Sequence, residues 1–319
     1  MQFLVRQPTD PDLVEAARVL RNGSLVAFPT ETVYGLGADA ENPEAVARIY
    51  TTKNRPANHP LIVHLADAED VTYWADWIPD YAKSLIAEYW PGPLTLLLKR
   101  SANAKDFVTG GQPTVGVRVP NHPLALELLK HFKAAGGHGL AAPSANRYGA
   151  VSPTSAQDVA DELAAYLKPS DLILDGGSAL VGVESTIVDC TGSNPVILRP
   201  GAITSEMIER SSGIIVQDPT ELSPKVSGSH KQHYSPKAKV VVSSSCAKDN
   251  GFIALAEIQT PDGAVRLAAP KDLQEYAREL YAALRRADSL GLASVSILPP
   301  EGEGLAVAIR DRITRAAAK

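Results

Sequence analysis

The sequence contains very little cysteine: only Cys190 and Cys246 among its 319 residues carry a thiol, and they lie far apart without a metal-ligand spacing. This excludes a disulfide framework and a cysteine-based zinc motif, and we expect two unpaired thiols in a reducing compartment. No segment approaches the roughly 18 consecutive apolar residues of a membrane span. Residues 1–6 also lack the basic region followed by an apolar one that marks a signal peptide. We therefore expect a cytoplasmic protein with no membrane anchor.

The chain also lacks a dense concentration of positive charge. It contains 31 Lys+Arg and 36 Asp+Glu, a net charge of -5. Residues 1–207 carry 16 of the basic and 23 of the acidic residues, a net -7, and the remainder carries 15 and 13, a net +2. A protein that binds nucleic acid stably concentrates lysine and arginine on one face. We therefore expect no stable binding to nucleic acid.

The length and an apolar content of 45% predict a substantial core and two domains. Residues 211–237 lack hydrophobic periodicity and are punctuated by proline, so we interpret them as a long linker. We expect the first domain over residues 1–210 and a small α/β domain over residues 238–319. In the small domain, alternating strands and helices predict parallel pairing. The expected strands are 240–242, 252–255 and 295–298, and the expected helices are 273–284 and 305–317.

Near the start of the chain, an apolar segment ends in proline, hydroxyl residues and glycine. Residues 24–28 are typical of a buried strand, and Pro29 cannot extend a strand ladder. Gly35 and Gly37 permit backbone conformations that other residues avoid. Hydroxyl groups and bare amides at a strand end suit an anionic or zwitterionic ligand. A plain strand-to-loop turn would have the same composition, so both interpretations stay open here.

Capping residues indicate where several helices begin and end. Residues 10–23 carry apolar side chains at helical spacing, with Gly23 placed to end the helix. Asn42 is expected to cap a second helix through Tyr50, with Pro43 in its first turn. Ser152 is expected to cap a further helix. Further strands are expected within residues 61–65, 94–98, 114–120, 140–146, 171–177, 184–189 and 196–201.

Lys53 and Arg55 lie between the second predicted helix and an apolar strand. Two cations at this spacing can project together into a cleft and hold a polyphosphate, with arginine gripping oxygens bidentately and lysine acting as a compact charge. A solvated surface pair has the same spacing and is the commoner case. His64, inside the following strand, is by itself more often a core histidine than a ligand.

Arg118 lies among valines in the segment 114–120. Burying an unpaired charge is costly, so this side chain requires an anionic partner. An internal carboxylate and a substrate carboxylate satisfy that requirement equally. Small, hydroxyl or cationic residues follow at least five of the predicted strands, and several such ends that converge on one crevice would form a site.

Seven motifs occur in order between residues 29 and 236: PTETVYGLG at 29–37, KNRPANHPLIVH at 53–64, TVGVRVP at 114–120, PSAN at 143–146, ESTIVD at 184–189, LRPG at 198–201 and HYSP at 233–236. Each motif alone has low specificity, but together they resemble the threonylcarbamoyl-AMP synthase family in its long, two-domain form. The resemblance implies an α/β fold with a YrdC-like twisted mixed-sheet domain, followed by a small Rossmann-like α/β domain.

The reaction that the resemblance implies joins L-threonine, bicarbonate or CO2, and ATP to give L-threonylcarbamoyladenylate and pyrophosphate. The enzyme would be a nucleotidyltransferase, and its product would pass to a tRNA threonylcarbamoyl-transfer complex that makes N6-threonylcarbamoyladenosine next to the anticodon. Two other interpretations remain. A carbamoyl-transfer protein of hydrogenase maturation would carry zinc-finger cysteines that this sequence lacks. An RNA-binding module is disfavoured by the acidic first domain.

The family's site residues map onto this sequence position by position. The resemblance places L-threonine on Thr32, His64, Arg118, Ala142 and Ser185, with Arg118 on its carboxylate. It places ATP on Lys53, Arg55, His59, Thr114, Ser144, Asn146, Ser152, Arg199 and Tyr234. Lys53, Arg55, Ser144 and Asn146 match the K-x-R and S-x-N signature and form the expected catalytic set. Mg2+ would arrive with ATP, because no carboxylate cluster marks a protein-held metal site. We expect Tyr234 to fold back over the site as part of a lid.

Overall fold

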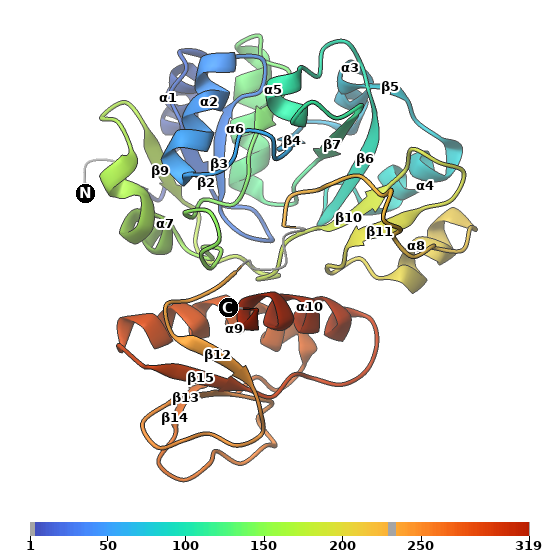
Figure 1. Cartoon of the computed structure of the whole chain (residues 1–319). Helices are drawn as coiled ribbons and strands as arrows, with labels where there is room; N and C mark the ends of the chain where they lie inside the picture. The colour runs from blue at the N-terminus through green and yellow to red at the C-terminus, as the bar shows by residue number, and fades with distance from the viewer. Residues whose placement is uncertain (1–3, 229–233, 319) are drawn as a thin grey trace.

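The computed structural model describes residues 4–228 and 234–318, so His233 of the last sequence motif lies outside the described residues. The chain forms a large α/β domain with a smaller α/β domain against it (Figure 1). Within the described ranges, no helix is both long and apolar enough to cross a bilayer. The mixed sheet of the large domain and the separate C-terminal sheet confirm the predicted fold class.

In the described part of the large domain, eleven strands form one mixed sheet in the order β1-β9-β2-β3-β8-β4-β7-β6-β10-β11, with β5 paired to β6. Strand β4 runs parallel to β7, whereas β6 runs antiparallel to β7 and parallel to β10. Strands far apart in the sequence thus become neighbours. The strands are β1 (Leu4–Arg6), β2 (Val26–Phe28), β3 (Gly35–Asp39), β4 (Ile62–His64), β5 (Ala75–Trp77), β6 (Leu94–Arg100), β7 (Thr114–Arg118), β8 (Leu140–Ala141), β9 (Leu172–Asp175), β10 (Thr186–Asp189) and β11 (Val196–Arg199).

Helices pack on both faces of this sheet. Helices α1 and α6 cover the face that carries Phe28, and α2 packs on the opposite face, which carries Leu25. The predicted cap Asn42 is confirmed, since its Oδ1 accepts hydrogen bonds from the backbone N–H groups of Glu44 and Ala45 at 3.0 and 3.1 Å. The helices are α1 (Asp10–Arg21), α2 (Pro43–Lys53), α3 (Val71–Trp74), α4 (Asp80–Tyr89), α5 (Asp106–Thr109), α6 (Pro123–Ala134), α7 (Ala156–Leu163) and α8 (Ser205–Ser212).

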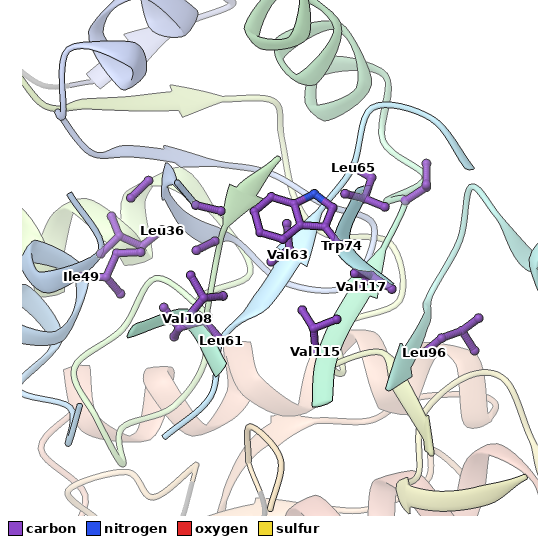
Figure 2. Close-up of a cluster of buried hydrophobic side chains, with 14 of the residues drawn as sticks. Leu36, Ile49, Leu61, Val63, Leu65, Trp74, Leu96, Val108, Val115 and Val117 are labelled. Carbon is purple, nitrogen blue, oxygen red and sulfur yellow. The ribbon is translucent and has the colours of Figure 1, made fainter. Parts of the chain in front are cut away.

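The main core shows the two-residue alternation of buried strands. Val63 of β4 and Val115 and Val117 of β7 are buried around Trp74 (Figure 2). The Trp74 indole N–H donates a hydrogen bond to a backbone carbonyl at 3.1 Å, so its polar atom is paired. Burying each such apolar side chain stabilises the fold by about 2 kcal/mol. The intervening residues of β4 and β7, including His64, are therefore turned to the opposite face.

The C-terminal domain has a sheet in the order β12-β15-β13-β14, and its pairs are all parallel, as predicted. Helices α9 and α10 lie between this sheet and the large domain (Figure 1). The sequence reasoning missed β14, which is short and interrupted by the charged Arg266. The elements are β12 (Lys239–Val242), β13 (Gly251–Ile253), β14 (Val265–Ala268), α9 (Leu273–Ser289), β15 (Ser294–Ile297) and α10 (Leu305–Ala317).

One predicted helix cap is wrong. Helix α7 is capped by Ser155, whose Oγ accepts the backbone N–H of Asp158 at 3.1 Å. Ser152 is instead fully buried, and its hydroxyl donates to Glu184 Oε1 at 2.5 Å. Two serines precede the helix closely, and either can act as a cap by local pattern alone. The long-range bond to Glu184 is what distinguishes them.

Candidate active site

A small cavity of about 40 Å³ lies at the ends of several strands of the large sheet, and linker residues form part of its wall. Strands β4 and β7, the end of α2, and the turns that follow β2 and β8 supply most of the other wall residues. Strand ends that are distant in the sequence therefore converge on one crevice. The lining residues that sequence reasoning had singled out are Thr32, Lys53, Arg55, His64, Arg118, Ala142, Ser144, Ser185, Arg199 and Tyr234.

His64 and Arg118 are paired neighbours in the register of β4 and β7, so the strand alternation presents both to the same side of the sheet. Burial, with a contribution from the Arg118 charge, lowers the pKa of His64 to about 3. The imidazole is therefore neutral at physiological pH. Its Nδ1 atom is buried and has no hydrogen-bond partner among the described residues, which leaves it available to a ligand.

The structure provides Arg118 with an internal carboxylate. Its Nη2 lies 2.7 Å from Glu31 Oε2, and both side chains are buried. Nε donates to the carbonyl oxygen of Gly92 at 3.1 Å, and Nη1 donates to Thr32 Oγ1 at 2.9 Å. Among the described residues, Arg118 lines the cavity and Glu31 does not. The guanidinium is thus fixed from one side and open to an anion on the other.

Lys53 is the last residue of α2 and is buried. Its ammonium donates to the backbone carbonyls of Ser144 and Asn146, each at 2.5 Å. Burial, followed by the nearby positive charge of Arg55, lowers the pKa of Lys53 well below its ordinary value. An anion bound beside it would favour the charged form and reverse this shift.

Arg199 is the last residue of β11, and its side chain bonds Ser185, which directly precedes β10. Its Nε donates to the carbonyl of Ser185 and its Nη2 to the Ser185 hydroxyl, both at 3.0 Å. The same hydroxyl lies 2.7 Å from Thr95 Oγ1. Ser185 is therefore held from two strands, with its side chain in the cavity wall.

The linker residue Ser227 contacts both arginines of the expected ATP site. Arg199 Nη1 donates to the Ser227 carbonyl at 3.0 Å, and Arg55 Nη2 lies 3.4 Å from the Ser227 hydroxyl as a donor. Arg55 also donates to the carbonyl of Pro60 at 2.9 Å. Ser227 thus presents oxygen atoms to two buried cations, as the oxygens of a bound polyphosphate would.

Four predicted ATP residues lie outside this cavity wall as described. His59 and Thr114 line a neighbouring open groove, together with linker residues 222–225. Asn146 is buried next to Lys53, and Ser152 is bonded to Glu184 behind the wall. The buried Thr114 Oγ1 and Asn146 Oδ1 have no hydrogen-bond partner among the described residues. Both atoms therefore remain available to a ligand.

Sequence reasoning missed several residues of the site. Glu184, Tyr148 and Ser227 line the cavity, and Glu31 fixes Arg118. Both glutamates lie inside motifs that were recognised, PTETVYGLG and ESTIVD. A carboxylate in an otherwise apolar or hydroxyl-rich strand end requires a cation for the same reason that Arg118 requires an anion. The need of a buried carboxylate for a cation could therefore have identified both glutamates from the sequence. No pattern in the linker sequence indicated Ser227.

Comparison with known proteins identifies the family. A family model described as "Telomere recombination" (Sua5, YciO and YrdC) matches residues 18–201, and one described as "Threonylcarbamoyl-AMP synthase, C-terminal domain" matches residues 203–318. The threonylcarbamoyl-AMP synthase of Pyrococcus abyssi is 39% identical over 321 residues, covering 94% of this chain and 92% of the relative. The chain belongs to the threonylcarbamoyl-AMP synthase family. This confirms the resemblance inferred from the seven motifs.

Two further proteins extend this comparison. The threonylcarbamoyl-AMP synthase of Bacillus subtilis is 44% identical over 241 residues, covering 73% of this chain and 67% of the relative. A crystal structure of P. abyssi Sua5 complexed with L-threonine matches this structure with a TM-score of 0.87 at 36% identity, covering 99% of this chain and 97% of that one. The similarity to threonylcarbamoyl-AMP synthases therefore extends through both domains.

Proposed function

We propose that this protein is a nucleotidyltransferase that makes L-threonylcarbamoyladenylate and pyrophosphate from L-threonine, bicarbonate or CO2, and ATP. The observation that carries the proposal is one cavity in which the buried cations Lys53, Arg55 and Arg199 meet Arg118. Four cations so close together favour substrates with several negative charges, such as an amino-acid carboxylate and a polyphosphate. The names of the curated relatives and the L-threonine complex of P. abyssi Sua5 support this choice of substrates.

L-threonine is proposed to bind on the Arg118 side of the cavity. The guanidinium, oriented by Gly92, Thr32 and Glu31, would receive the carboxylate. Neutral His64 offers the unpaired Nδ1 to a polar group of the amino acid without adding charge. Ala142 and Ser185 complete this part of the wall.

ATP is proposed to bind with its phosphates on the cavity cations other than Arg118. Lys53, Arg55 and Arg199 would neutralise the phosphate oxygens, with Ser144 and Asn146 beside Lys53. The neighbouring groove with His59 and Thr114 would accommodate the nucleoside portion. Tyr234 would close over the phosphates from the wall of the cavity. Ser152 would act indirectly, because its hydroxyl is bonded to Glu184.

The proposed chemistry needs no protein nucleophile. The unprotonated amino group of L-threonine first adds to CO2 and releases a proton to give a carbamate. A carbamate oxygen then attacks the α-phosphorus of ATP, the bond from that phosphorus to the bridging oxygen breaks, and pyrophosphate leaves. Such a transfer depends on positioning and on neutralising charge at the phosphoryl oxygens. Lys53, Ser144, Arg55 and Asn146 would supply this environment.

Mg2+ is proposed to enter with ATP. In the described parts of the chain, no three His, Cys, Asp or Glu side chains gather as metal ligands. The cavity instead offers cations, and the buried, unpaired amide oxygen of Asn146 lies next to Lys53 outside the cavity wall. Mg2+ commonly takes most of its ligands from phosphate and water. The donor set therefore fits a metal that the nucleotide holds, whose role would be to neutralise phosphate charge.

The linker is proposed to open and close the site as a lid. Pockets that hold a small molecule usually measure about 300–1,000 Å³. The cavity of about 40 Å³, closed in part by Ser227, Gly228 and Tyr234, is far smaller. Movement of these residues would admit ATP and threonine. Closure afterwards would exclude water from the labile carbamate and adenylate.

The product is proposed to pass to a cytoplasmic complex that transfers the threonylcarbamoyl group to tRNA. The net charge of -5 is consistent with an enzyme that does not hold tRNA stably itself. The protein would then act on small molecules only, and a second system would carry out the tRNA step.

Mass spectrometry of a reaction with ATP, Mg2+, L-threonine and 13C-labelled bicarbonate tests the proposed function. We expect an adenylate that contains threonine and one labelled carbon, together with pyrophosphate. Omitting threonine should abolish the adenylate, which separates this activity from formation of a simple carbamoyl adenylate. An adenylate that forms equally well without threonine, or no adenylate at all, contradicts the proposal.

A further inference from the structure

A second buried ion pair joins the C-terminal domain to the cavity wall. Arg312 of α10 donates from Nε to Glu184 Oε2 at 2.7 Å, and the two side chains are 0% and 7% exposed. Glu184 lines the cavity and directly precedes Ser185. The C-terminal domain therefore places a cation in contact with a wall residue of the site in the other domain.

The Glu184 carboxylate is held at both oxygens. Oε1 accepts the Ser152 hydroxyl at 2.5 Å, and Oε2 accepts the Tyr281 hydroxyl at 2.9 Å as well as Arg312. Burial alone would raise the pKa of Glu184, but Arg312 and Arg199 outweigh it and lower the pKa to about 2. The group is thus an anion with a fixed orientation, bonded to two helices of the C-terminal domain.

Two of the partners of Glu184 also contact Tyr234. The Arg312 guanidinium carbon lies 5.3 Å from the centroid of the Tyr234 ring, within the range of a cation–π contact. On α9, the ring of Tyr281 stacks on Tyr234 with centroids 5.6 Å apart and an interplanar angle of 28°. Tyr234 is buried and lines the cavity. Two of the groups that bind Glu184, Arg312 and Tyr281, therefore also contact the linker tyrosine.

We propose that Arg312, Tyr281 and Glu184 are positioning residues that hold Tyr234 in the cavity wall, so that the C-terminal domain completes the active site. This inference rests on the proposed function. The charge of Glu184 anchors the Tyr281 hydroxyl and the Arg312 guanidinium, and these two side chains then set the plane of the Tyr234 ring. The C-terminal domain thereby holds Tyr234 in its place in the cavity wall.

The alternative is that the Arg312–Glu184 pair only joins the two domains and does not position Tyr234. Arg285 provides a matched control that tests this alternative. Arg285 of α9 also reaches the large domain, where it pairs with Glu162 at 2.8 Å and donates to the carbonyl of Val151. It joins the same domains through Glu162 in place of Glu184. We therefore compare Arg312→Lys with Arg285→Lys, each of which keeps the charge and removes the planar fork.

The comparison uses the full-length protein and two measurements. The first is hydrogen exchange of the backbone amides of Tyr234, Ser235, Lys237 and Ala238, and the second is the rate of adenylate formation at saturating substrates. For Arg312→Lys we expect faster exchange and a roughly tenfold lower rate, whereas Arg285→Lys should stay within about twofold of wild type in both. In a Tyr234→Ala background, Arg312→Lys should cause no further loss of rate, because Arg312 acts through that ring.

Equal effects of the two lysine substitutions, or a full additional loss in the Tyr234→Ala background, overturn the proposal. If Arg312→Lys does not fold, Tyr281→Phe decides by the same measurements, because it removes one hydrogen bond to Glu184 and keeps the stacked ring. Unchanged exchange and rate in Tyr281→Phe would then also overturn it. If the wild-type protein makes no adenylate, the proposed function fails, and the exchange comparison alone still decides whether Arg312 holds Tyr234.

Discussion

Each of two buried arginine–glutamate pairs contributes one residue to the wall of the same cavity, an arginine in one pair and a glutamate in the other. In the pair Arg118–Glu31, the described cavity wall contains the arginine and not the glutamate. In the pair Arg312–Glu184, it contains the glutamate and not the arginine. The first pair lies within the large domain, and the second connects the domains. The residue that lines the cavity determines whether the pair can bind a substrate anion or can only orient protein side chains.

Glu31 binds Arg118 from outside the cavity wall, so the arginine can bind an anion in the cavity. Arg312 binds Glu184 from outside the cavity wall, and the glutamate orients neighbouring protein side chains. Buried ion pairs contribute little net stability on average, because desolvation offsets their attraction, but losing one partner is costly. Their value here lies in orientation. Arg118 would orient a substrate carboxylate, and Glu184 orients protein side chains around Tyr234.

The largest expected effect is on stability in Glu31→Gln. This change leaves the buried Arg118 charge without its carboxylate, which should lower the free energy of unfolding by about 3 kcal/mol. Urea unfolding measures the loss, and added L-threonine should restore part of it by supplying a new carboxylate. Glu15→Gln, in an exposed pair with Arg18, should change stability by less than about 1 kcal/mol. A Glu31→Gln protein as stable as wild type would show that the pair is unimportant.

Arg118→Lys should have the next largest effect, on threonine binding. Lysine keeps the charge but cannot bond Gly92, Thr32 and a substrate carboxylate at once. We expect the threonine KM to rise roughly seventyfold, which corresponds to a loss of about 2.5 kcal/mol of binding free energy. The ATP KM should change much less. Steady-state kinetics with each substrate varied in turn measure this. Equal increases in both KM values would argue against a specific carboxylate contact.

The neutral His64 beside Arg118 should make stability depend on pH. Its pKa is lowered from 6.5 to about 3 in the folded protein, so between these values only the unfolded chain binds the proton. Stability therefore falls as the pH drops from 7, by about 2 kcal/mol at pH 5. Urea unfolding of His64→Gln should show a smaller loss between pH 7 and pH 5. A loss in His64→Gln identical to that of the wild type would contradict this role for His64.

The smallest expected effect comes from the linker glycine next to Tyr234. Gly228 has φ +84°, and a Cβ there would lie 2.4 Å from the Tyr234 hydroxyl oxygen. Gly228→Ala should displace that ring and lower the rate of adenylate formation about tenfold. Gly213→Ala has comparable backbone strain at φ +70° but nothing within 4 Å, so it should keep the rate. If the two variants have the same rate, the position of Tyr234 does not limit the reaction.

The sequence predicted those parts of the fold that depend on local pattern. Short apolar segments identified β4 and β7, and the cap at Asn42 located α2. Because these elements end at one edge of the sheet, many of the strand-end residues singled out in the sequence line one cavity. Local pattern did not distinguish Ser152 from Ser155 as a cap, since the deciding bond reaches Glu184.

Long-range partners were beyond the sequence. The need of Arg118 for an anion was evident, but the choice of Glu31 depends on how a turn folds over a strand that follows much later in the chain. Glu184 and Arg312 are separated by 128 residues and meet only because the domains pack together. Ser227 lacks any pattern that marks it, and its contacts with Arg55 and Arg199 follow from the path of the linker.

The most direct test of this account is a calorimetric titration of L-threonine into three full-length proteins: wild type, Arg118→Lys and Arg312→Lys. All three retain a positive charge at both positions, so the comparison isolates which arginine faces the substrate. We expect Arg312→Lys to bind threonine within about threefold of wild type and Arg118→Lys to bind it at least roughly thirtyfold more weakly. Threonine affinity that is unchanged in Arg118→Lys, or lost equally in both variants, would contradict the assignment of Arg118 to the substrate and Arg312 to the protein.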